Sequence, residues 1–245
     1  MRIFLGLVVV MCFSLSTLVG QGWVDIGIKG GAGLSVMYND NLWNDRGVDV
    51  KFKGGNTYGG KIGINFNNNR AITIDFMSSK IQQAYTFRTP SGNFTINSAY
   101  KSFDIPLLYR YNSDYGSYME VGGQMSMIKS LTETGRPTPY PSLDGMMVEK
   151  YYAAVFGFGS YVVGTNNLYL TMGFRMTYGF NDLIDQDGGF NQANYYPFLG
   201  SYTPDFPYES YKATNPFTFN FIMELNYDLG YIAKSNCNRE AIIFF

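Results

Sequence analysis

Apolar and polar residues alternate along most of the chain with a period of two. Between Phe217 and Leu229, for example, every odd position is Phe, Met, Leu or Tyr, whereas the even positions carry mainly Thr, Asn, Glu and Asp. This alternation predicts β-strands with one apolar face, because successive side chains of a strand point to opposite sides of the sheet. We expect eight strands, over residues 24–34, 57–66, 72–77, 103–111, 119–127, 152–161, 168–178 and 217–229.

The connections between these strands alternate in length. The short ones are 67–69, 112–115 and 164–167, and the longer ones are 37–55, 86–93, 132–147 and 181–215. Short turns at one rim and long loops at the other are typical of outer-membrane barrels. We therefore predict an all-β fold, an eight-stranded antiparallel transmembrane β-barrel with short periplasmic turns and long extracellular loops. A soluble β-sandwich is the alternative, but it gives no reason for an apolar outward face or for loops gathered at one edge.

The first residues resemble a secretory signal peptide, with a basic start at Arg2, an apolar stretch from Ile3 and a small-residue exit near Gly20. We expect residues 1–20 to be this signal peptide, 21–232 the outer-membrane barrel and 233–245 a C-terminal tail. Cys12 suggests a lipoprotein as an alternative, but no small residue directly precedes it. The predicted location is the outer membrane of a Gram-negative bacterium, after cleavage of the signal peptide.

Composition excludes several classes of function. Among the 245 residues, 18 Lys and Arg oppose 19 Asp and Glu, so nothing indicates nucleic acid as a partner. There is no histidine, which removes Ser-His and Asp-His catalysis and histidine metal sites. We expect no enzymatic activity, no metal and no cofactor; a hydrolase that uses only carboxylates is the remaining enzymatic alternative.

The polar parity of the strands carries charges into the interior of the predicted barrel. An eight-stranded barrel is just wide enough for side chains to fill it, so buried charges must pair. We predict a salt-bridged network that stiffens the lumen, with a proton or ion path as the alternative. Its members are Lys29, Lys61, Asp75, Arg110, Glu120, Arg175 and Glu224. Four of the charged residues, Asp25, Asp104, Arg110 and Asp228, are expected nearer the periplasmic end.

Four lysines fall on the apolar parity, far from the periplasmic ends of four consecutive strands: Lys80, Lys101, Lys129 and Lys150. This spacing places them at the extracellular rim facing outward, where they would meet the phosphates of lipopolysaccharide. Outer-membrane lipid and lipopolysaccharide are therefore predicted partners. The alternative is that the strands end there and the alternation lapses.

The longest connection, 181–215, combines aromatic residues with acids. This composition suits the binding of a protein partner or a glycan, and the alternative is a lid that packs on itself over the barrel mouth. The predicted binding surface consists of Tyr195, Tyr196, Phe198, Tyr202, Phe206 and Tyr208. The stretch 185–188 lacks the ligand spacing of a calcium loop, so we assign no metal there.

Four segments resemble the PorT-like outer-membrane β-barrel proteins of Bacteroidota: Gly27–Gly31, Phe103–Tyr111, Tyr118–Gly122 and Phe174–Gly179. The sequence Ile-Pro-Leu-Leu at 105–108 is the most specific of these, whereas the tail 233–245 departs from the usual pattern. The resemblance implies a barrel in the outer membrane, and the family includes a component of the type IX secretion apparatus. We expect a non-enzymatic accessory or surface-binding component of the cell envelope, with another envelope protein as its partner. The alternative is a component of the secretion apparatus.

Overall fold

The structure, a computed structural model, describes residues 22–67, 69–90, 92–135, 147–165, 167–185 and 210–231. Within them, eight antiparallel strands form one closed barrel, in which each strand pairs with its neighbours in the chain and the last strand pairs with the first. The strands are β1 (Trp23–Tyr38), β2 (Val48–Asn67), β3 (Arg70–Thr89), β4 (Gly92–Asn112), β5 (Ser117–Thr134), β6 (Lys150–Gly164), β7 (Leu168–Gly179) and β8 (Asn215–Tyr231). The predicted eight-stranded antiparallel barrel is confirmed.

A short helix, α2 (Asp40–Asn44), lies between β1 and β2. The side chain of Asn39 caps it by accepting hydrogen bonds from the backbone N–H groups of Asn41 and Leu42. In the described part of the chain, no helix has the length and apolar character needed to cross a bilayer.

The alternation seen in the sequence determines which side chains face outward. On β1, Ile28 is 66% exposed, whereas its neighbour Lys29 is 3% exposed. The same contrast recurs around the barrel, where the outward set includes Ile62, Ile74, Leu107, Val121, Phe156, Phe174 and Phe221. We call this outward apolar surface the apolar belt. The barrel thus has an apolar exterior and, at the same level, a polar interior.

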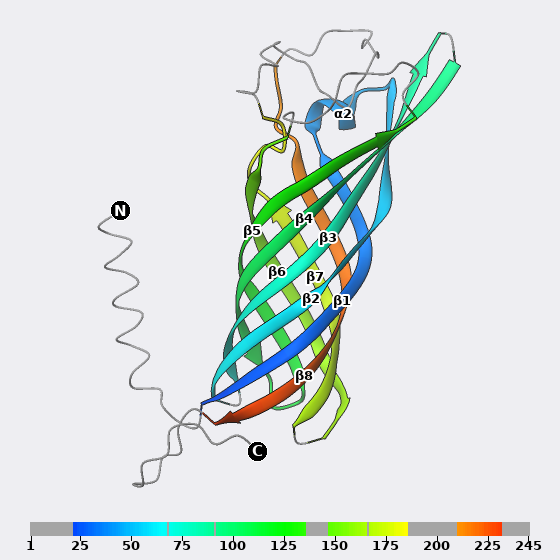
Figure 1. Cartoon of the computed structure of the whole chain (residues 1–245). Helices are drawn as coiled ribbons and strands as arrows, with labels where there is room; N and C mark the ends of the chain where they lie inside the picture. Colours follow the sequence, from blue (N-terminus) through cyan, green and yellow to red (C-terminus); the bar gives the residue numbers. More distant parts are fainter. Residues whose placement is uncertain are drawn as a thin grey trace, which may run out of the picture.

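The strands are longer than predicted, so two connections are shorter than expected. The connection predicted over 37–55 runs only from 39 to 47, because β2 already begins at Val48. The one predicted over 86–93 reduces to 90–91, because β3 continues to Thr89 and β4 begins at Gly92, whose φ of +126° favours glycine. This β3–β4 hairpin extends beyond the rest of the barrel, at the end that carries α2 (Figure 1).

We call the end with α2 and the β3–β4 hairpin the loop end, and the opposite one the short-turn end (Figure 1). At the short-turn end, β4 and β5 are joined by residues 113–116, where Gly116 has a φ of +82° and its N–H donates to the carbonyl oxygen of Ser113 at 3.0 Å. At the loop end, the strands that flank the long connections predicted over 132–147 and 181–215 end at Thr134 and Gly179 and begin at Lys150 and Asn215.

Pro106 does not produce the bulge that its ring suggests within a strand. Its register with β5 is continuous, opposite Gln124, and the β4–β5 shift lies instead between Lys101 and Ser102. On the other side, the β3–β4 register has no partners for Ile105 and Pro106, although it is unchanged above and below them. The proline therefore costs local pairing with β3, as expected of a residue without an N–H group, while β5 holds the strand in place.

A hydrophobic core fills the barrel at the loop end. It joins Leu42 of α2 and Leu183 of the β7–β8 connection to inward side chains of β3 and β4, among them Tyr85 and Tyr100. We call this set the apolar cap, and its buried members are Met37, Leu42, Val48, Ile81, Tyr85, Phe87, Ile96, Tyr100, Tyr151, Ala153, Leu183 and Ile184. The interior therefore consists of a polar section and an apolar section, one above the other.

Candidate functional site

The seven charges predicted for the lumen lie together at mid-depth, each contributed by a different strand. The register of neighbouring strands places a base directly opposite an acid in three pairs: Lys29 with Glu224, Lys61 with Asp75, and Arg110 with Glu120. Opposite charges that face one another across a ladder stabilise the sheet. The strand pairing itself therefore builds the cluster.

Glu224 is the residue with the most ionic partners. Its carboxylate lies 3.0 Å from Lys29, 2.7 Å from Lys61 and 2.8 Å from Arg110. Arg110 donates one hydrogen bond to each carboxylate oxygen, a bidentate geometry that fixes both side chains. The guanidinium of Arg110 also lies 4.3 Å from the centre of the Tyr118 ring, in a cation–π contact.

Asp75 and Glu120 complete the cluster on its other side. The carboxylate of Asp75 accepts from Lys29 and Arg175, both at 2.9 Å. Glu120 accepts from Arg175 at 2.6 Å and from Arg110 at 2.9 Å. Because each arginine bridges two carboxylates, the ion pairs form one connected network that crosses the lumen.

Asp25 lies toward the short-turn end, near the start of β1, and its side chain also belongs to the network, which the sequence did not indicate. Its carboxylate lies 3.0 Å from Lys61 and accepts a hydrogen bond from the hydroxyl of Tyr169 at 3.1 Å. With Asp25 included, four cations oppose four carboxylates, and no side chain of the eight is more than 6% exposed. We call these eight residues the ion-paired plug. Its charges balance, and removing a single member would leave a buried charge without its partner.

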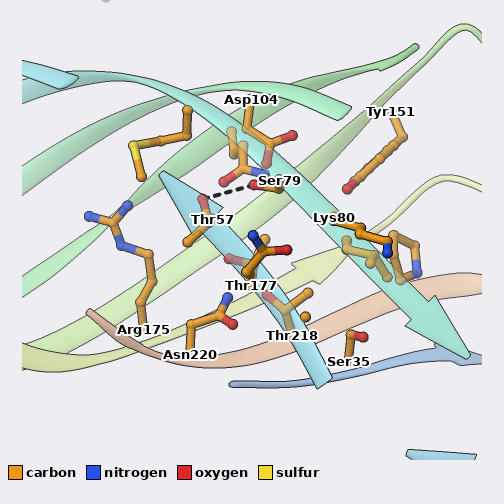
Figure 2. Close-up of a pocket in the computed structure, with 16 residues that line it drawn as sticks. Ser35, Thr57, Ser79, Lys80, Asp104, Tyr151, Arg175, Thr177, Thr218 and Asn220 are labelled. Atoms are coloured by element: carbon orange, nitrogen blue, oxygen red, sulfur yellow. Dashed lines mark hydrogen bonds between the residues drawn. The ribbon is translucent and has the colours of Figure 1, made fainter. Parts of the chain in front are cut away.

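The plug separates two cavities. Above it, toward the apolar cap, a cavity of about 30 Å³ has room for about two water molecules. Figure 2 shows this upper cavity, in which the hydroxyl of Ser79 donates to that of Thr57 at 2.9 Å beside Asp104. Below the plug, a larger cavity of about 170 Å³ lies at the short-turn end. The plug and the apolar cap are therefore two seals in series along the lumen.

Two charges lie higher than the sequence suggested. Asp104 lines the upper cavity with Tyr151, on the loop side of the plug, and not near the short-turn end. The reason is that β4 runs toward the short-turn end and Asp104 still has eight residues of the strand ahead of it. The backbone of Arg110 is near the short-turn end, opposite Ala71, but its long side chain reaches up to Glu224.

The polarity of the wall inverts along β3 and β4. Toward the short-turn end, Ile74 and Phe76 face outward and Asp75 faces inward. Toward the loop end, Tyr85 and Phe87 are fully buried inside, whereas the outward positions are polar, among them Thr86, Arg88, Thr95 and Asn97. Apolar side chains avoid water, so this inversion marks a change in the surroundings of the wall from an apolar medium to water.

The four lysines predicted at the rim lie at this inversion. Lys80 and Lys101 are direct partners across the β3–β4 ladder, and Lys101, Lys129 and Lys150 are exposed. Lys150 lies opposite Met127 on β5. Lys129 departs from the predicted alternation, because it is the extra residue of a bulge between Ile128 and Ser130.

A groove of about 400 Å³ lies on the wall beside Lys80. Its lining is polar apart from Ala99 and comes from β2 to β5, and it includes Lys53, Lys80, Gln82, Asn97, Thr132 and Thr134. No acidic residue is among the described residues that line it. We call Lys80, Lys101, Lys129, Lys150 and this groove together the basic wall.

The aromatic surface predicted on the longest connection lies outside the described residues, because Tyr195, Tyr196, Phe198, Tyr202, Phe206 and Tyr208 fall between residues 185 and 210. The described ends of this connection pack onto the barrel. Leu183 and Ile184 belong to the apolar cap, and the hydroxyl of Tyr211 donates to Asp182. In the portion of the chain that the structure describes, no group of His, Cys, Asp or Glu side chains is arranged to hold a metal ion.

These features define a class of protein. A closed barrel of eight antiparallel strands, with an apolar exterior and a charged interior at the same level, has the architecture of outer-membrane barrels. No model of a protein family matches the chain, and no curated protein is similar to it in sequence.

Solved structures of outer-membrane barrels are similar in fold. The outer-membrane protein OprG of Pseudomonas aeruginosa is 10% identical, with 86% of this chain and 98% of that one covered and a TM-score of 0.45. Neisserial surface protein A is 11% identical, with coverages of 84% and 98% and a TM-score of 0.37. The outer-membrane protease OmpT of Escherichia coli is 11% identical, with coverages of 86% and 97% and a TM-score of 0.33. At these identities and TM-scores, the similarity concerns the fold alone and assigns no function to this chain.

Proposed function

We propose that this protein is a non-enzymatic outer-membrane barrel of a Gram-negative envelope, closed to diffusion, whose basic wall binds the phosphates of lipopolysaccharide at the cell surface. The observation that carries the proposal is the inversion of wall polarity at Lys80 and Lys101. A bilayer around the apolar belt and water around the hairpin account for the inversion together.

Strand length supports this placement. A strand needs about 9–11 residues to cross the hydrocarbon core at its usual tilt, whereas β3 has 20 residues and β4 has 21. About half of each strand therefore extends beyond the bilayer. The projecting half is the half with polar outward positions, and the lysines lie at its base.

The positions of Lys80 and Lys101 favour an anionic ligand. Like charges that face each other directly across a ladder repel, and no acid is among the described residues that line the groove beside Lys80. A phosphate group placed between the two ammonium groups would turn this repulsion into two attractions. Lys129 and Lys150 continue the positive charge onto β5 and β6 at the same rim.

A lipid-binding measurement tests the proposal. The double variant Lys80→Gln/Lys101→Gln is compared with Lys51→Gln/Arg88→Gln, which removes the same charge from other exposed positions of β2 and β3. After purification in mild detergent, lipid A phosphate per barrel is quantified by mass spectrometry. We expect several-fold less lipid A with the first variant and an unchanged amount with the second. Equal retention by both variants would contradict the proposal.

A conductance measurement tests the closed lumen. Because the plug and the apolar cap lie in series, we expect no unit conductance above background in planar bilayers that contain the purified barrel. Frequent openings of uniform size would instead support the alternative of an ion path through the charged network.

We further propose that the barrel works as an accessory or surface-binding component beside another envelope protein. The resemblance to PorT-like barrels supplies the alternative, a component of a type IX-like secretion apparatus. A mild-detergent pull-down from native outer membranes, with an unrelated eight-stranded barrel as control, separates the two. Co-purification of secretion components in fixed ratio favours the alternative, and another stoichiometric partner favours the accessory role.

A further inference from the structure

The cavity at the short-turn end is a separate site, on the far side of the plug from the basic wall. Its volume is about 170 Å³, and it is bordered by residues of the 113–116 turn at the barrel mouth. Aromatic and neutral polar side chains share its lining, notably Trp23, Tyr118, Tyr161, Tyr169, Asn65 and Thr171. Tyr161, at the mouth, is 45% exposed.

Several buried polar atoms at this cavity have no hydrogen-bond partner among the described residues. They are the Nδ2 of Asn65, the Oγ1 of Thr171, the Oδ1 of Asp25 and the Nε of Arg110. All four residues line the cavity, and all are at least nine-tenths buried. Buried polar groups nearly always have partners, and these residues place hydrogen-bond donors and acceptors around the cavity, which suits a guest that both donates and accepts hydrogen bonds.

The charged side chains that line the cavity are all members of the plug, which argues against an ionic guest. Lys61 is already paired with Asp25 and Glu224, and Arg110 with Glu120 and Glu224. The plug is electroneutral, so it offers no excess charge to an ion. The amide of Asn65, which donates, and the hydroxyl of Thr171, which both donates and accepts, suit hydroxyl groups on a guest.

Size and aromatic lining narrow the guest further. A cavity of about 150 Å³ holds a benzene molecule, so one of about 170 Å³ that opens at the barrel mouth limits the guest to a single six-membered ring. Tyr161 and Tyr169 lie with ring centres 6.3 Å apart and an angle of 31° between their planes. Aromatic faces at the mouth pack against an apolar ring face, while the inner polar atoms meet hydroxyl groups on the ring edge.

We propose that the short-turn end of the barrel binds one ring of a neutral sugar. In the orientation proposed above, the sugar would be the terminal unit of a periplasmic glycan. The site is independent of lipid A binding, because the two lie on opposite sides of the plug.

The protein provides its own reporter for this site. It contains two tryptophans, Trp23 in the cavity and Trp43 on α2 at the other end of the barrel. In Trp43→Phe, the full chain therefore carries a single tryptophan at the site. We would titrate this variant in detergent with glucose and with N-acetylglucosamine, and use glucose 6-phosphate and cyclohexanol as a charged and a hydroxyl-poor control.

We expect a saturable change in Trp23 fluorescence, with a dissociation constant near 1 mM, typical of weak binding. The two neutral sugars should bind at least tenfold more tightly than either control compound. Trp23→Phe, which leaves Trp43 as the reporter, should show no change. Substituting Tyr161→Ala at the mouth, where folding is least affected, should weaken binding at least fivefold, and Thr171→Val should do the same from inside.

Fluorescence can be silent for a bound sugar, so ligand-detected saturation-transfer NMR is recorded on the same samples. Transfer from the barrel to a neutral sugar that disappears in Tyr161→Ala would support the site. No transfer to either sugar, or transfer that is unchanged in both Tyr161→Ala and Thr171→Val, would overturn the proposal and leave the cavity to water.

Discussion

The two sections of the lumen are sealed by different physics. The ion-paired plug fills the section of the lumen that the apolar belt surrounds. The apolar cap fills the section at the loop end, where the β3–β4 hairpin begins to project. In the first section the outside is apolar and the inside charged; in the second, along β3 and β4, the outside is polar and the inside apolar. The exterior of these two strands thus contrasts with the interior at both levels, and in the placement proposed above the inversion marks the level at which the medium changes.

The two seals also differ in how they depend on the chain. The plug depends on register, because the ladders place three of its bases directly opposite acids, and two of these pairs, Lys29 with Glu224 and Arg110 with Glu120, are ion pairs. A shift of one residue in any of these ladders would turn a charge toward the belt. The apolar cap depends instead on segments from outside the strands, since Leu42 comes from α2 and Leu183 from the β7–β8 connection. The plug therefore specifies the register of the strands, and the apolar cap closes the loop end of the lumen.

The largest effect is expected at the centre of the plug. Glu224→Ala leaves Lys29, Lys61 and Arg110 buried around an absent carboxylate, and breaking a buried ion pair in this way costs about 3–5 kcal/mol. Asp49→Ala removes an exposed carboxylate 3.7 Å from Lys51 and should cost at most about 1 kcal/mol. Urea unfolding of both variants in one detergent measures the difference. Equal midpoints would show that the plug does not hold the barrel together.

A smaller and more local effect is expected in the cap. Leu183→Ala opens a cavity in the apolar cap, and the cost should be near the lower end of such substitutions, about 2 kcal/mol, because a connection relaxes more easily than a closed ladder. Hydrogen exchange should increase at α2 and at the described ends of the β7–β8 connection, with the exchange of β1 and β8 at mid-barrel unchanged. Exchange that rises equally in both places would mean that cap and plug unfold as one unit.

A matched change on the outer surface sharpens this result. Leu34→Ala removes a leucine that is exposed on the wall of β1, so it creates no internal cavity. We expect no change in exchange at α2 for this variant. An equal loss of protection in Leu34→Ala would attribute the effect to the loss of apolar surface in general and not to the cap.

Alternation predicted the barrel and placed seven of the eight plug residues, all but Asp25, in one charged network, since Lys29, Asp75 and Glu224 are charges on the inward parity of apolar-faced strands. It could not give their pairing, which depends on register and hence on the exact residue at which each turn closes. Nor could it show that Arg110 reaches up to Glu224, because the length of the side chain moves its charge away from the level of its backbone.

The cap was missed for a different reason. From Tyr85 to Arg88 the alternation continues, but the inward positions are now apolar and the outward positions polar. Under the rule for a wall in lipid, this reversal looks like the end of the strand, so the connections 37–55 and 86–93 were predicted too long. A search for period-two alternation of either sign would have found the upper halves of β3 and β4.

The smallest predicted effect concerns Lys80 and Lys101, the pair of lysines at the inversion of wall polarity. In detergent without lipopolysaccharide, Lys80→Gln removes the repulsion from Lys101 and should stabilise the barrel by about 0.2–1 kcal/mol. With lipopolysaccharide added, the same substitution removes a phosphate contact, so the sign of the effect should reverse. Urea midpoints with and without lipopolysaccharide measure both values, and Lys51→Gln serves as the control because its neighbour Asp49 is an acid. If Lys80→Gln changed the stability in the same direction under both conditions, lipopolysaccharide would not be the ligand of the basic wall. The change of medium at this level would then rest on the position of the apolar belt alone.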